Sequence, residues 1–579
     1  MTSETREVSF PSTPPPPLRL WPGVLIVALQ WLLRFVVPVI EPEAMPVGVL
    51  GGLAGGVAVL AWWLFFSRAR WSDRLGLVVV IAAAIFATWR IVHPSIAGGM
   101  MGLMLFVYIL PGLSLALVAS AAATRKLADG SRRAVMVTSI LFSCLIWTLV
   151  RTGGFSSDLN HDWAWRWAPT PEDRLVSRSA VKAPAPVPVP PSPLNPAATW
   201  PGFRGPNRDS IIRGVKIETN WSLHPPIELW RQPVGPGWSS FAVGDGLLYT
   251  QEQRGEDEIV ACYRLNTGEP VWKHQDPVRF WESNAGPGPR GTPTLHQGRV
   301  YTFGATGVLN TLNAQTGAVL WSRQAATDTK AKLPEWGFSS SPLVEGDRLI
   351  VATSGILTAY DLATGAPRWT GPTEGGGYSS PHALEIGGVR QIVFMSGAGA
   401  TSVNPADGKV LWQHPWKGFP IVQPAQLPDG DLLISTGDTN GVRRLQITRD
   451  QATWTVQERW SSTRLKPYFN DYVVHRGHAF GFNSGSLACI DLADGERKWK
   501  GGRYGAGQLV LLADQDVLLV LSEQGDLALV SAATTDFTEF ARLKALEGKT
   551  WNHPVLAGNV LLVRNDREMV ALKLAMNTP

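Results

Sequence analysis

The sequence predicts an all-β fold, an eight-bladed β-propeller, preceded by an α-helical membrane domain of about five transmembrane helices. Three observations support this prediction. A motif repeats five times in the C-terminal part of the chain, most of its copies lie one blade length apart, and five apolar segments precede it. The chain has 579 residues. Because one hydrophobic core rarely exceeds roughly 250–300 residues, more than one domain is expected.

Each copy of the motif has Thr or Asp before a Gly, and a Trp four residues after that Gly. The Gly allows the positive φ that a tight turn needs, and the Thr or Asp side chain can hydrogen-bond the turn backbone. The Trp falls on the next strand, where its ring can pack on a neighbouring sheet. The five copies place the structural residues at Gly268, Trp272, Gly317, Trp321, Gly365, Trp369, Gly408, Trp412, Gly495 and Trp499.

The Trp residues of successive copies are 49, 48, 43 and 87 residues apart. A period in the mid-forties with four short strands per unit is typical of propeller blades. The last interval holds two units, and Trp460 is the expected anchor of the degenerate copy. Division at the Trp positions and near Phe540 gives eight blades, or seven if one weak unit is misassigned.

The two ends of the repeat region complement each other. Ile227–Gln232 has the composition of a fourth blade strand without the first three, and Trp551–Leu574 supplies three strands without a fourth. Pairing the two ends would complete the last blade and close the ring, which removes exposed sheet edges.

Five apolar segments at about 20–40, 46–66, 75–92, 100–123 and 134–150 are each near the roughly 20 residues that cross a bilayer. Lys and Arg occur in the loops after the second and fourth segments, and the other two loops contain neither. Since basic loops stay in the cytoplasm, the N-terminus is expected in the cytoplasm and the propeller in the periplasm of a bacterial inner membrane.

The expected domains are a disordered cytoplasmic tail (1–19), a five-helix transmembrane domain (20–151), a Trp-containing segment with a Pro-rich linker (152–198) and the propeller (199–579). Arg34 lies well inside the first apolar segment. Such a residue either reaches the interface, where it could pair with Glu41, or marks a functional pocket such as a quinone site.

Several function classes find no support in the sequence. We find no basic, aromatic-interleaved stripe of the kind that binds nucleic acid. The three cysteines include no CxxC, CxxCH or adjacent pair, and no phosphate-binding loop motif is present. The expected partners are the lipid bilayer, through the five helices, and a periplasmic protein or peptide.

A ligand site is expected at the mouth of the central channel, just before or at the start of the first strand of each blade. The candidates there are Trp238, Arg290, Trp336, Ser340, Tyr378, His382, Asn470, Trp551 and His553. Such a ring of polar and aromatic groups could hold a flat anionic ligand by pairing with Arg and by stacking. The alternative is that these residues cap strand starts and line a wet channel.

The repeat D-x-x-T-G-x-x-x-W resembles the tryptophan-docking repeat of quinoprotein dehydrogenases and the propeller repeat of the BamB family. The segments WPGFRGPNRD at 200–209, GPGPRGTPTL at 286–295 and WGFSSSPLVEGD at 336–347 look closer to PQQ-binding-like β-propeller repeat proteins, most of which have no assigned activity. A five-span domain before such a propeller also resembles membrane-bound glucose dehydrogenase. That resemblance implies PQQ with a divalent ion and electron transfer to ubiquinone.

Two functions follow. The first is a membrane-anchored periplasmic binding or scaffold module without catalysis, for which no cofactor is assigned. The second is a membrane-bound PQQ-dependent dehydrogenase that oxidises a sugar or alcohol and feeds the quinone pool. In the second case Glu282 and Asn284 would hold Ca²⁺, Asp471 would be the general base and Arg290 would face the quinone oxygens.

Overall fold

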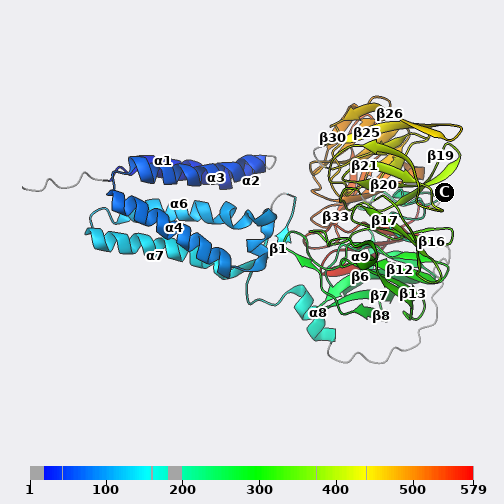
Figure 1. Ribbon diagram of the computed structural model, residues 1–579, viewed down its shortest axis with the longest axis horizontal. Coiled ribbons are helices and arrows are strands. Elements are labelled where there is room, and N and C mark those ends of the chain that lie inside the picture. The colour runs from blue at the N-terminus through cyan, green and yellow to red at the C-terminus, as the bar shows by residue number, and fades with distance from the viewer. Residues whose placement is uncertain are drawn as a thin grey trace, which may run out of the picture. The chain divides into compact units, whose positions relative to one another are not determined.

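The computed structural model describes residues 18–41, 44–157, 161–179, 199–372, 374–437 and 440–577. It divides into two compact units, Met1–Ala168 and Pro169–Pro579 (Figure 1). The expected cytoplasmic tail falls almost entirely outside the described residues, and so does the Pro-rich linker at 181–196. The second unit also contains α8 (Pro171–Ser179), so the boundary expected at residue 199 stays a prediction.

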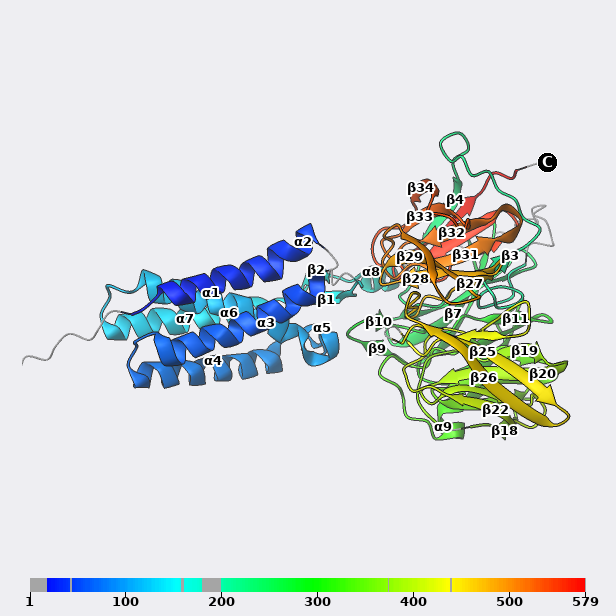
Figure 2. The same cartoon turned by 90° about the horizontal axis from the view of Figure 1, so that it is seen from above.

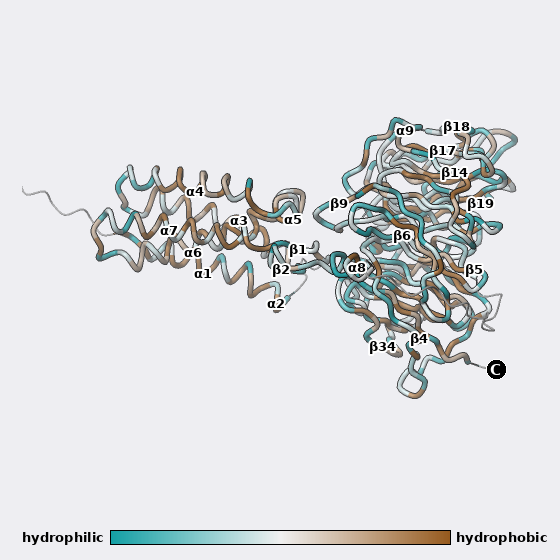
Figure 3. Tube along the Cα trace, turned by 90° about the horizontal axis from the view of Figure 1, so that it is seen from below, coloured by the Kyte–Doolittle hydropathy of each residue, from teal (hydrophilic) through white to brown (hydrophobic). Residues whose placement is uncertain are grey.

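The first unit is built from long helices with short connections. They are α1 (Trp21–Trp31), a π-helical turn (Leu32–Val36), α2 (Val37–Ile40), α3 (Met45–Ala61), a second π-helical turn (Trp62–Phe66), α4 (Trp71–Ile91), α5 (Pro94–Ala97), a 3₁₀ turn (Gly99–Gly102), α6 (Met104–Ala123) and α7 (Asp129–Thr148). The hairpin of β1 (Val150–Phe155) and β2 (His161–Trp165) follows. Apolar residues follow these helices along most of their length (Figure 3).

Four helices in the described part of the chain are long and apolar enough to cross a membrane: Trp21–Ile40, Met45–Phe66, Trp71–Ile91 and Met104–Ala123. The expectation of about five is therefore corrected to four by this criterion. The fifth expected segment is helical, as α7, but its first turn contains Asp129, Arg132 and Arg133, which shortens its apolar stretch.

The glycines of α3 allow α1 to approach closely. Gln30 Nε2 donates to the Gly52 carbonyl oxygen at 2.7 Å, and a Cβ on Gly52 would lie 3.1 Å from Arg34 Cδ. The Arg34 guanidinium is buried and lies over the ring of Tyr108 at 4.9 Å. Arg34 is therefore packed against α6 inside the first unit and does not reach the end of its helix.

The second unit contains eight blade sheets in a ring, which confirms the eight-bladed propeller. Seven have four antiparallel strands, and one has a short fifth strand, β3 (Ile211–Ile212), parallel to its innermost strand. The first four blades, each from its innermost strand outward, are β5 (Ala242–Gly244), β6 (Leu247–Arg254), β7 (Asp257–Arg264) and β8 (Pro270–Asp276); β11 (Thr294–His296), β12 (Arg299–Phe303), β13 (Val308–Asn313) and β14 (Val319–Gln324); β15 (Leu343–Glu345), β16 (Arg348–Thr353), β17 (Ile356–Asp361) and β18 (Pro367–Thr370); and β19 (His382–Ile386), β20 (Val389–Ser396), β21 (Gly399–Val403) and β22 (Val410–Pro415).

The last four blades are β23 (Ala425–Gln426), β24 (Leu432–Ile434), β25 (Val442–Asp450) and β26 (Thr453–Ser462); β27 (Val473–His475), β28 (His478–Asn483), β29 (Ser486–Asp491) and β30 (Arg497–Gly501); β31 (Gln508–Leu512), β32 (Val517–Leu521), β33 (Asp526–Ser531) and β34 (Glu539–Lys544); and β35 (Val555–Ala557), β36 (Val560–Arg564), β37 (Glu568–Lys573) and β4 (Ile227–Pro233). The smaller elements are β3 (Ile211–Ile212), β9 (Trp281–Glu282), β10 (Gly286–Pro287), α9 (Ala325–Thr329) and a 3₁₀ turn (Ala513–Gln515). The long β25–β26 ribbon is clearly visible in Figure 2.

The ring closes between its two ends as the sequence predicts. Strand β4 pairs antiparallel with β37, and Trp230 lies opposite Ala571. The eighth blade therefore takes three strands from the C-terminal end and one from the N-terminal end of the propeller. Neither end of the ring is left with an unpaired blade, so no open sheet edge remains at the junction.

Neighbouring blades are joined by a contact between the motif Trp of one blade and the motif Gly of the next. A Cβ on Gly365 would lie 2.6 Å from the Trp321 ring, and Trp321 Nε1 donates to the Leu362 carbonyl oxygen at 3.2 Å. The same arrangement joins Trp230 to Gly268, Trp272 to Gly317, Trp369 to Gly408 and Trp460 to Gly495. Trp412 and Trp499 make other contacts: their indole N–H groups donate to Gln391 Oε1 and to the Ala533 carbonyl oxygen, both at 2.8 Å.

Replacing Gly365 with Ala tests this contact. Both Gly365 (φ +72°) and Gly298 (φ +70°) have positive φ, but a Cβ on Gly298 would meet no atom within 4 Å. We expect Gly298→Ala to lower the free energy of unfolding by about 1–2 kcal/mol because of the positive φ. Gly365→Ala should lower the free energy of unfolding by roughly 1–3 kcal/mol more than Gly298→Ala does, since Trp321 must move.

The midpoint of urea unfolding, followed by Trp fluorescence, measures this difference. Equal midpoints for the two variants would show that the Trp–Gly contact does not limit stability.

Candidate functional site

Seven aromatic side chains meet at the end of the channel where the innermost strands begin. They come from the loops before β5, β15, β19, β23, β27 and β35, and we call them the aromatic arc: Trp238, Trp336, Tyr378, Phe419, Tyr468, Phe469 and Trp551. Four of them belong to the predicted mouth residues. The structure therefore brings Trp238, Trp336, Tyr378 and Trp551 together.

The aromatic arc is continuous. Trp336 stacks on Tyr378 with ring centroids 5.2 Å apart, and both rings contact Phe419, at 5.3 Å and 5.1 Å. Trp336 also contacts Tyr468, at 6.4 Å. Since Trp336 belongs to the third blade and Tyr468 to the sixth, this contact crosses the mouth of the channel. From Tyr468 the arc continues through Phe469, Trp551 and Trp238, with centroid separations of 5.4, 5.0 and 4.8 Å.

A lysine ammonium lies at one end of the aromatic arc. Lys549 Nζ is 4.4 Å from the Trp551 ring centroid and 5.1 Å from that of Trp238, which is the range of cation–π contacts. Nζ also donates to the Asn284 carbonyl oxygen at 3.3 Å. Burial lowers the pKa of Lys549 to about 8, although nearby carboxylates such as Glu282 and Glu523 oppose this shift.

Arg290 is buried in the loop beside the aromatic arc. Its guanidinium donates to carbonyl oxygens of Gly286, Pro287, Gly288 and Trp336, and Nη2 lies 3.1 Å from Glu282 Oε1. Burial lowers the pKa of Arg290 to about 10. These contacts use the donors of the guanidinium, so Arg290 holds the β9–β10 loop in place.

Glu282 is committed to the same loop. Its carboxylate accepts the backbone N–H of Asn284 and of Ala285, both at 2.7 Å, and pairs with Arg290. Within the described ranges no group of three or more His, Cys, Asp or Glu side chains gathers with metal-ligand geometry. The roles of Glu282 and Asn284 as Ca²⁺ ligands stay predictions, and this donor arrangement does not fit a divalent ion well because the carboxylate oxygens already accept hydrogen bonds.

The segment Trp200–Ser210, which we call the lead, crosses the channel below the aromatic arc. It contacts the first strands or preceding loops of six blades, including the second, where Leu295 N donates to the Pro201 carbonyl oxygen at 2.7 Å. Trp200 bridges to Val243, Arg204 Nη2 donates to the Tyr472 carbonyl oxygen at 3.0 Å, and Arg208 Nη2 donates to that of Ser341 at 3.2 Å. Ser210 Oγ lies 2.9 Å from His553 Nε2, and Ser210 O accepts from Leu511 N. A segment with these partners must pass through the middle of the ring.

The remaining predicted residues lie around the lead. Asp471 accepts the Gln423 backbone N–H at 2.7 Å, and its Oδ2 lies 3.5 Å from Arg204 Nε. Burial raises the pKa of Asp471. Burial also lowers the pKa of His553, to about 3. Ser340 and Asn470 are buried and bond neighbouring backbone N–H groups, as expected of residues that cap strand starts.

Sequence reasoning missed the other members of the arc and the path of the lead. Phe419, Tyr468, Phe469 and Lys549 lie within six residues of the first strand of their blades, as the predicted members do, so their position was a usable signal. Arg208 and the crossing of the channel had no such signal, because the lead does not belong to the repeat.

Comparison with known proteins places the propeller in a family. A model of the family described as outer membrane protein assembly factor BamB matches residues 256–423 and 391–576. BamB of Yersinia pestis is 23% identical over 336 residues, which are 55% of this chain and 72% of that protein. BamB of Shewanella oneidensis is 30% identical over 149 residues, or 25% of this chain and 33% of that protein.

Two solved structures superpose on this chain at low identity. BamB from Moraxella catarrhalis superposes with a TM-score of 0.46 and 15% identity, over 61% of this chain and 99% of that one. A quinohemoprotein alcohol dehydrogenase from Pseudomonas putida HK5 superposes with a TM-score of 0.48 and 15% identity, over 66% and 81% of the two chains.

The lowered pKa of Lys549 can be measured by acylation with acetic anhydride, because only the neutral amine reacts. We expect the rate at Lys549 to rise with a midpoint near pH 8. Lys409 is the internal control, since it is exposed and its hydrogen bond to Asp407 raises its pKa. Its rate should still be rising at pH 10. Mass spectrometry measures acetylation at both lysines, and identical pH profiles would contradict the burial of the Lys549 ammonium.

Proposed function

We propose that this chain, which belongs to the family of the outer membrane protein assembly factor BamB, is a membrane-anchored binding module that presents the aromatic arc to a protein partner. The observation that carries the proposal is the arc itself. Phe419 is 46% exposed and Tyr468 is 37% exposed, although both rings pack on other aromatic rings. Rigid, partly exposed aromatic side chains with a cation beside them are the usual anchors of a protein interface.

The alternative of a PQQ-dependent dehydrogenase needs a base and a cation near the arc and a divalent-ion site. The arrangement of the predicted residues does not favour it. Arg290 and Glu282 bind each other and the β9–β10 loop, and Asp471 faces Arg204 of the lead. The groups that would hold or activate a quinone thus have structural partners. We therefore do not derive a reaction for this chain.

The number of membrane crossings in the first unit decides on which side of the membrane the aromatic arc lies. If only the four apolar helices cross, the propeller shares the side of the N-terminus. If α7 also crosses, the two lie on opposite sides. The charges of α7 favour crossing, because they gather at one end. Arg133 Nη2 lies 2.7 Å from Asp73 Oδ1, and Asp129 Oδ2 lies 3.1 Å from Arg70 Nη1, at the start of α4.

Helix α7 therefore begins level with α4 and packs along α4 and α6. With 20 residues at 1.5 Å each it is about 30 Å long; its apolar part after Arg133 is about 22 Å long, and its charged start lies at the interface. We infer five crossings of the bacterial inner membrane, a cytoplasmic N-terminus and a periplasmic propeller.

Cysteine labelling tests this topology in the full chain. The three native cysteines are buried, so the background is low. An impermeant maleimide added to cells with a permeabilised outer membrane should label Leu223→Cys in the propeller, where Leu223 is 73% exposed. It should label Leu127→Cys, between α6 and α7, only after lysis. Equal labelling of both sites in intact cells would show that α7 does not cross.

Site-specific photo-crosslinking in cells tests the binding role. A photoreactive amino acid at position 419 should give a discrete protein adduct, because this position lies in the arc. Phe540 is the matched control, since it is a similarly exposed phenylalanine (49% against 46%) on β34. Trp336→Ala should reduce the adduct at position 419 at least fivefold, because Trp336 packs on Phe419.

Two outcomes would reject the proposal. One is an absent adduct, or an adduct equally strong at positions 419 and 540. The other is dye-linked oxidation of alcohols or sugars by the purified full chain after addition of PQQ and Ca²⁺, which would establish the dehydrogenase instead.

A further inference from the structure

A cavity of about 720 Å³ lies on the side of the lead away from the aromatic arc. It is lined by the second half of the lead and the residues that follow it, and by segments of β15, β19, β23 and β27 with the loops beside them. The lining residues of the first group are Arg204, Pro206, Asn207, Arg208, Asp209, Ile211 and Arg213. Those of the second group lie further along the inner strands than those of the arc, and none of the arc residues belongs to the lining. This volume is within the range of small-molecule sites.

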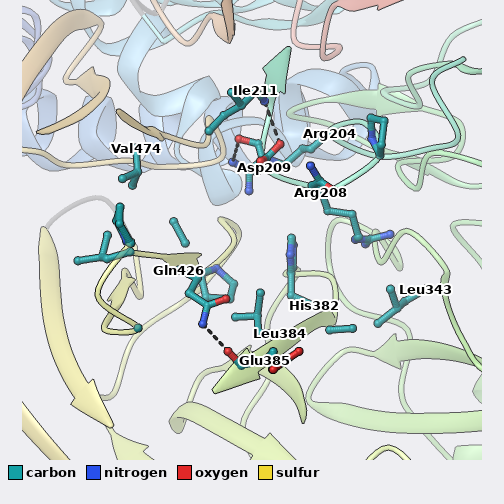
Figure 4. Close-up of a pocket in the computed structure, with 18 of the residues that line it drawn as sticks. Arg204, Arg208, Asp209, Ile211, Leu343, His382, Leu384, Glu385, Gln426 and Val474 are labelled. Atoms are coloured by element: carbon teal, nitrogen blue, oxygen red, sulfur yellow. Dashed lines mark hydrogen bonds between the residues drawn. The ribbon is translucent and has the colours of Figure 1, made fainter. Parts of the chain in front are cut away.

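The cavity is lined by both apolar and cationic side chains. Leu343, Leu384 and Val474 come from three different blades, and four arginines also belong to the lining (Figure 4). Three of these arginines have carboxylate partners. Arg213 pairs with Asp209 at 3.1 Å, Arg390 with Glu345 at 2.8 Å, and Arg204 lies 3.5 Å from Asp471.

Arg208 is the fourth arginine, and no ion pair is found for it within the described part of the chain. It donates to the carbonyl oxygens of Pro342 and Ser341, at 3.0 Å and 3.2 Å. Its Nε is buried and has no hydrogen-bond partner among the described residues. Burial and the neighbouring Arg204 lower the pKa of Arg208 to about 9, so it remains a cation at neutral pH. Arg208 thus contributes a guanidinium without a direct ion pair, although Glu385 also lines the cavity and the charge of Asp471 acts on Arg208 from a distance.

His382 supplies a second unpartnered group. It lies at the start of β19, is 3% exposed, and its buried Nε2 has no hydrogen-bond partner in the same described ranges. Arg208 and His382 both line the cavity and are labelled in Figure 4, and the charge of Arg208 acts on His382. Burial, together with Arg208 and Arg204, holds the pKa of His382 well below its usual value. In the tautomer with the proton on Nε2, the neutral ring can donate to a ligand.

The backbone of the lead is also strained at this point. Arg204, Arg208 and Ser210 have φ of 61°, 55° and 60°, which non-glycine residues seldom adopt. Residues held in this region cost roughly 1–3 kcal/mol each and cluster at binding sites. These strained residues place the Arg208 cation in a cavity that also has apolar lining residues.

We propose that this cavity binds a small organic anion, with a carboxylate or phosphate group between Arg208 and His382 and an apolar body against Leu343, Leu384 and Val474. A buried Nε–H without a partner on a partly buried cation is costly, and an anion with two oxygens satisfies both this Nε–H and the imidazole. The apolar lining residues Leu343, Leu384 and Val474 should give ligands with a hydrocarbon part a higher affinity than inorganic ions. This site is separate from the aromatic arc and does not depend on the role proposed for the arc.

Calorimetric titration of the full chain in a nonionic detergent tests the proposal with three probes of equal chain length: hexanoate, hexyl phosphate and hexanol. We expect saturable binding of at least one of the two anions, at least tenfold tighter than that of hexanol. Comparison of hexanoate with hexyl phosphate identifies the preferred anionic group. Arg208→Gln should weaken anion binding at least tenfold, because it removes the guanidinium that has no ion pair.

His382→Phe is the second variant, since it keeps a ring of similar size and removes the nitrogen donor. It should also weaken anion binding, and it still tests the proposal if the Arg208→Gln variant does not fold. Arg464→Gln is the control, because Arg464 is an exposed arginine that pairs with Glu496 and does not line the cavity. It should bind like the wild type. Anion binding no tighter than that of hexanol, or unchanged in the folded variants, would overturn the proposal.

Discussion

The contact between a Trp of one blade and a Gly of the next is the constraint on which the propeller depends. It joins five pairs of neighbouring blades. In one of them the ring of Trp321 needs the bare Cα of Gly365, and its indole N–H needs the carbonyl oxygen of Leu362 in the turn before that Gly. The orphan strand β4 makes this contact too, through Trp230 and Gly268. Closure of the ring therefore uses the same interaction as the junctions within it.

This constraint lies on the outer part of the blades, so it leaves the inner loops free. The loops before the first strands carry no part of the motif, and their side chains meet only because the ring sets the width of the channel. Rigid scaffolds with variable loops at one end are a common basis for binding sites. Here the loops bring aromatic rings from six blades into one arc, and Trp336 reaches Tyr468 across the mouth.

The sequence predicted what is local and repeated, and it missed what depends on distance in space. Sequence reasoning could predict the motif, the eight blades, the closure through β4 and four members of the arc. Each of these predictions rests on residues close to a strand boundary. Helix α7 was harder, since Asp129, Arg132 and Arg133 belong to the helix itself. The path of the lead could not be predicted from the sequence, because its partners are far away along the chain. Tyr472, Ser341 and His553 are 268, 133 and 343 residues from the lead residues that they contact.

The lead also changes the meaning of Asp471. A buried carboxylate near a channel mouth is a reasonable candidate for a general base. In the structure, however, its oxygens face Arg204 and the Gln423 N–H, and Arg204 in turn holds Ser210 Oγ at 2.8 Å. Asp471 thereby anchors the segment that separates the aromatic arc from the cationic cavity. If Arg204 lost this partner, its charge would join that of Arg208, and the lead would lose its fixed position between the two chemically different ends of the channel.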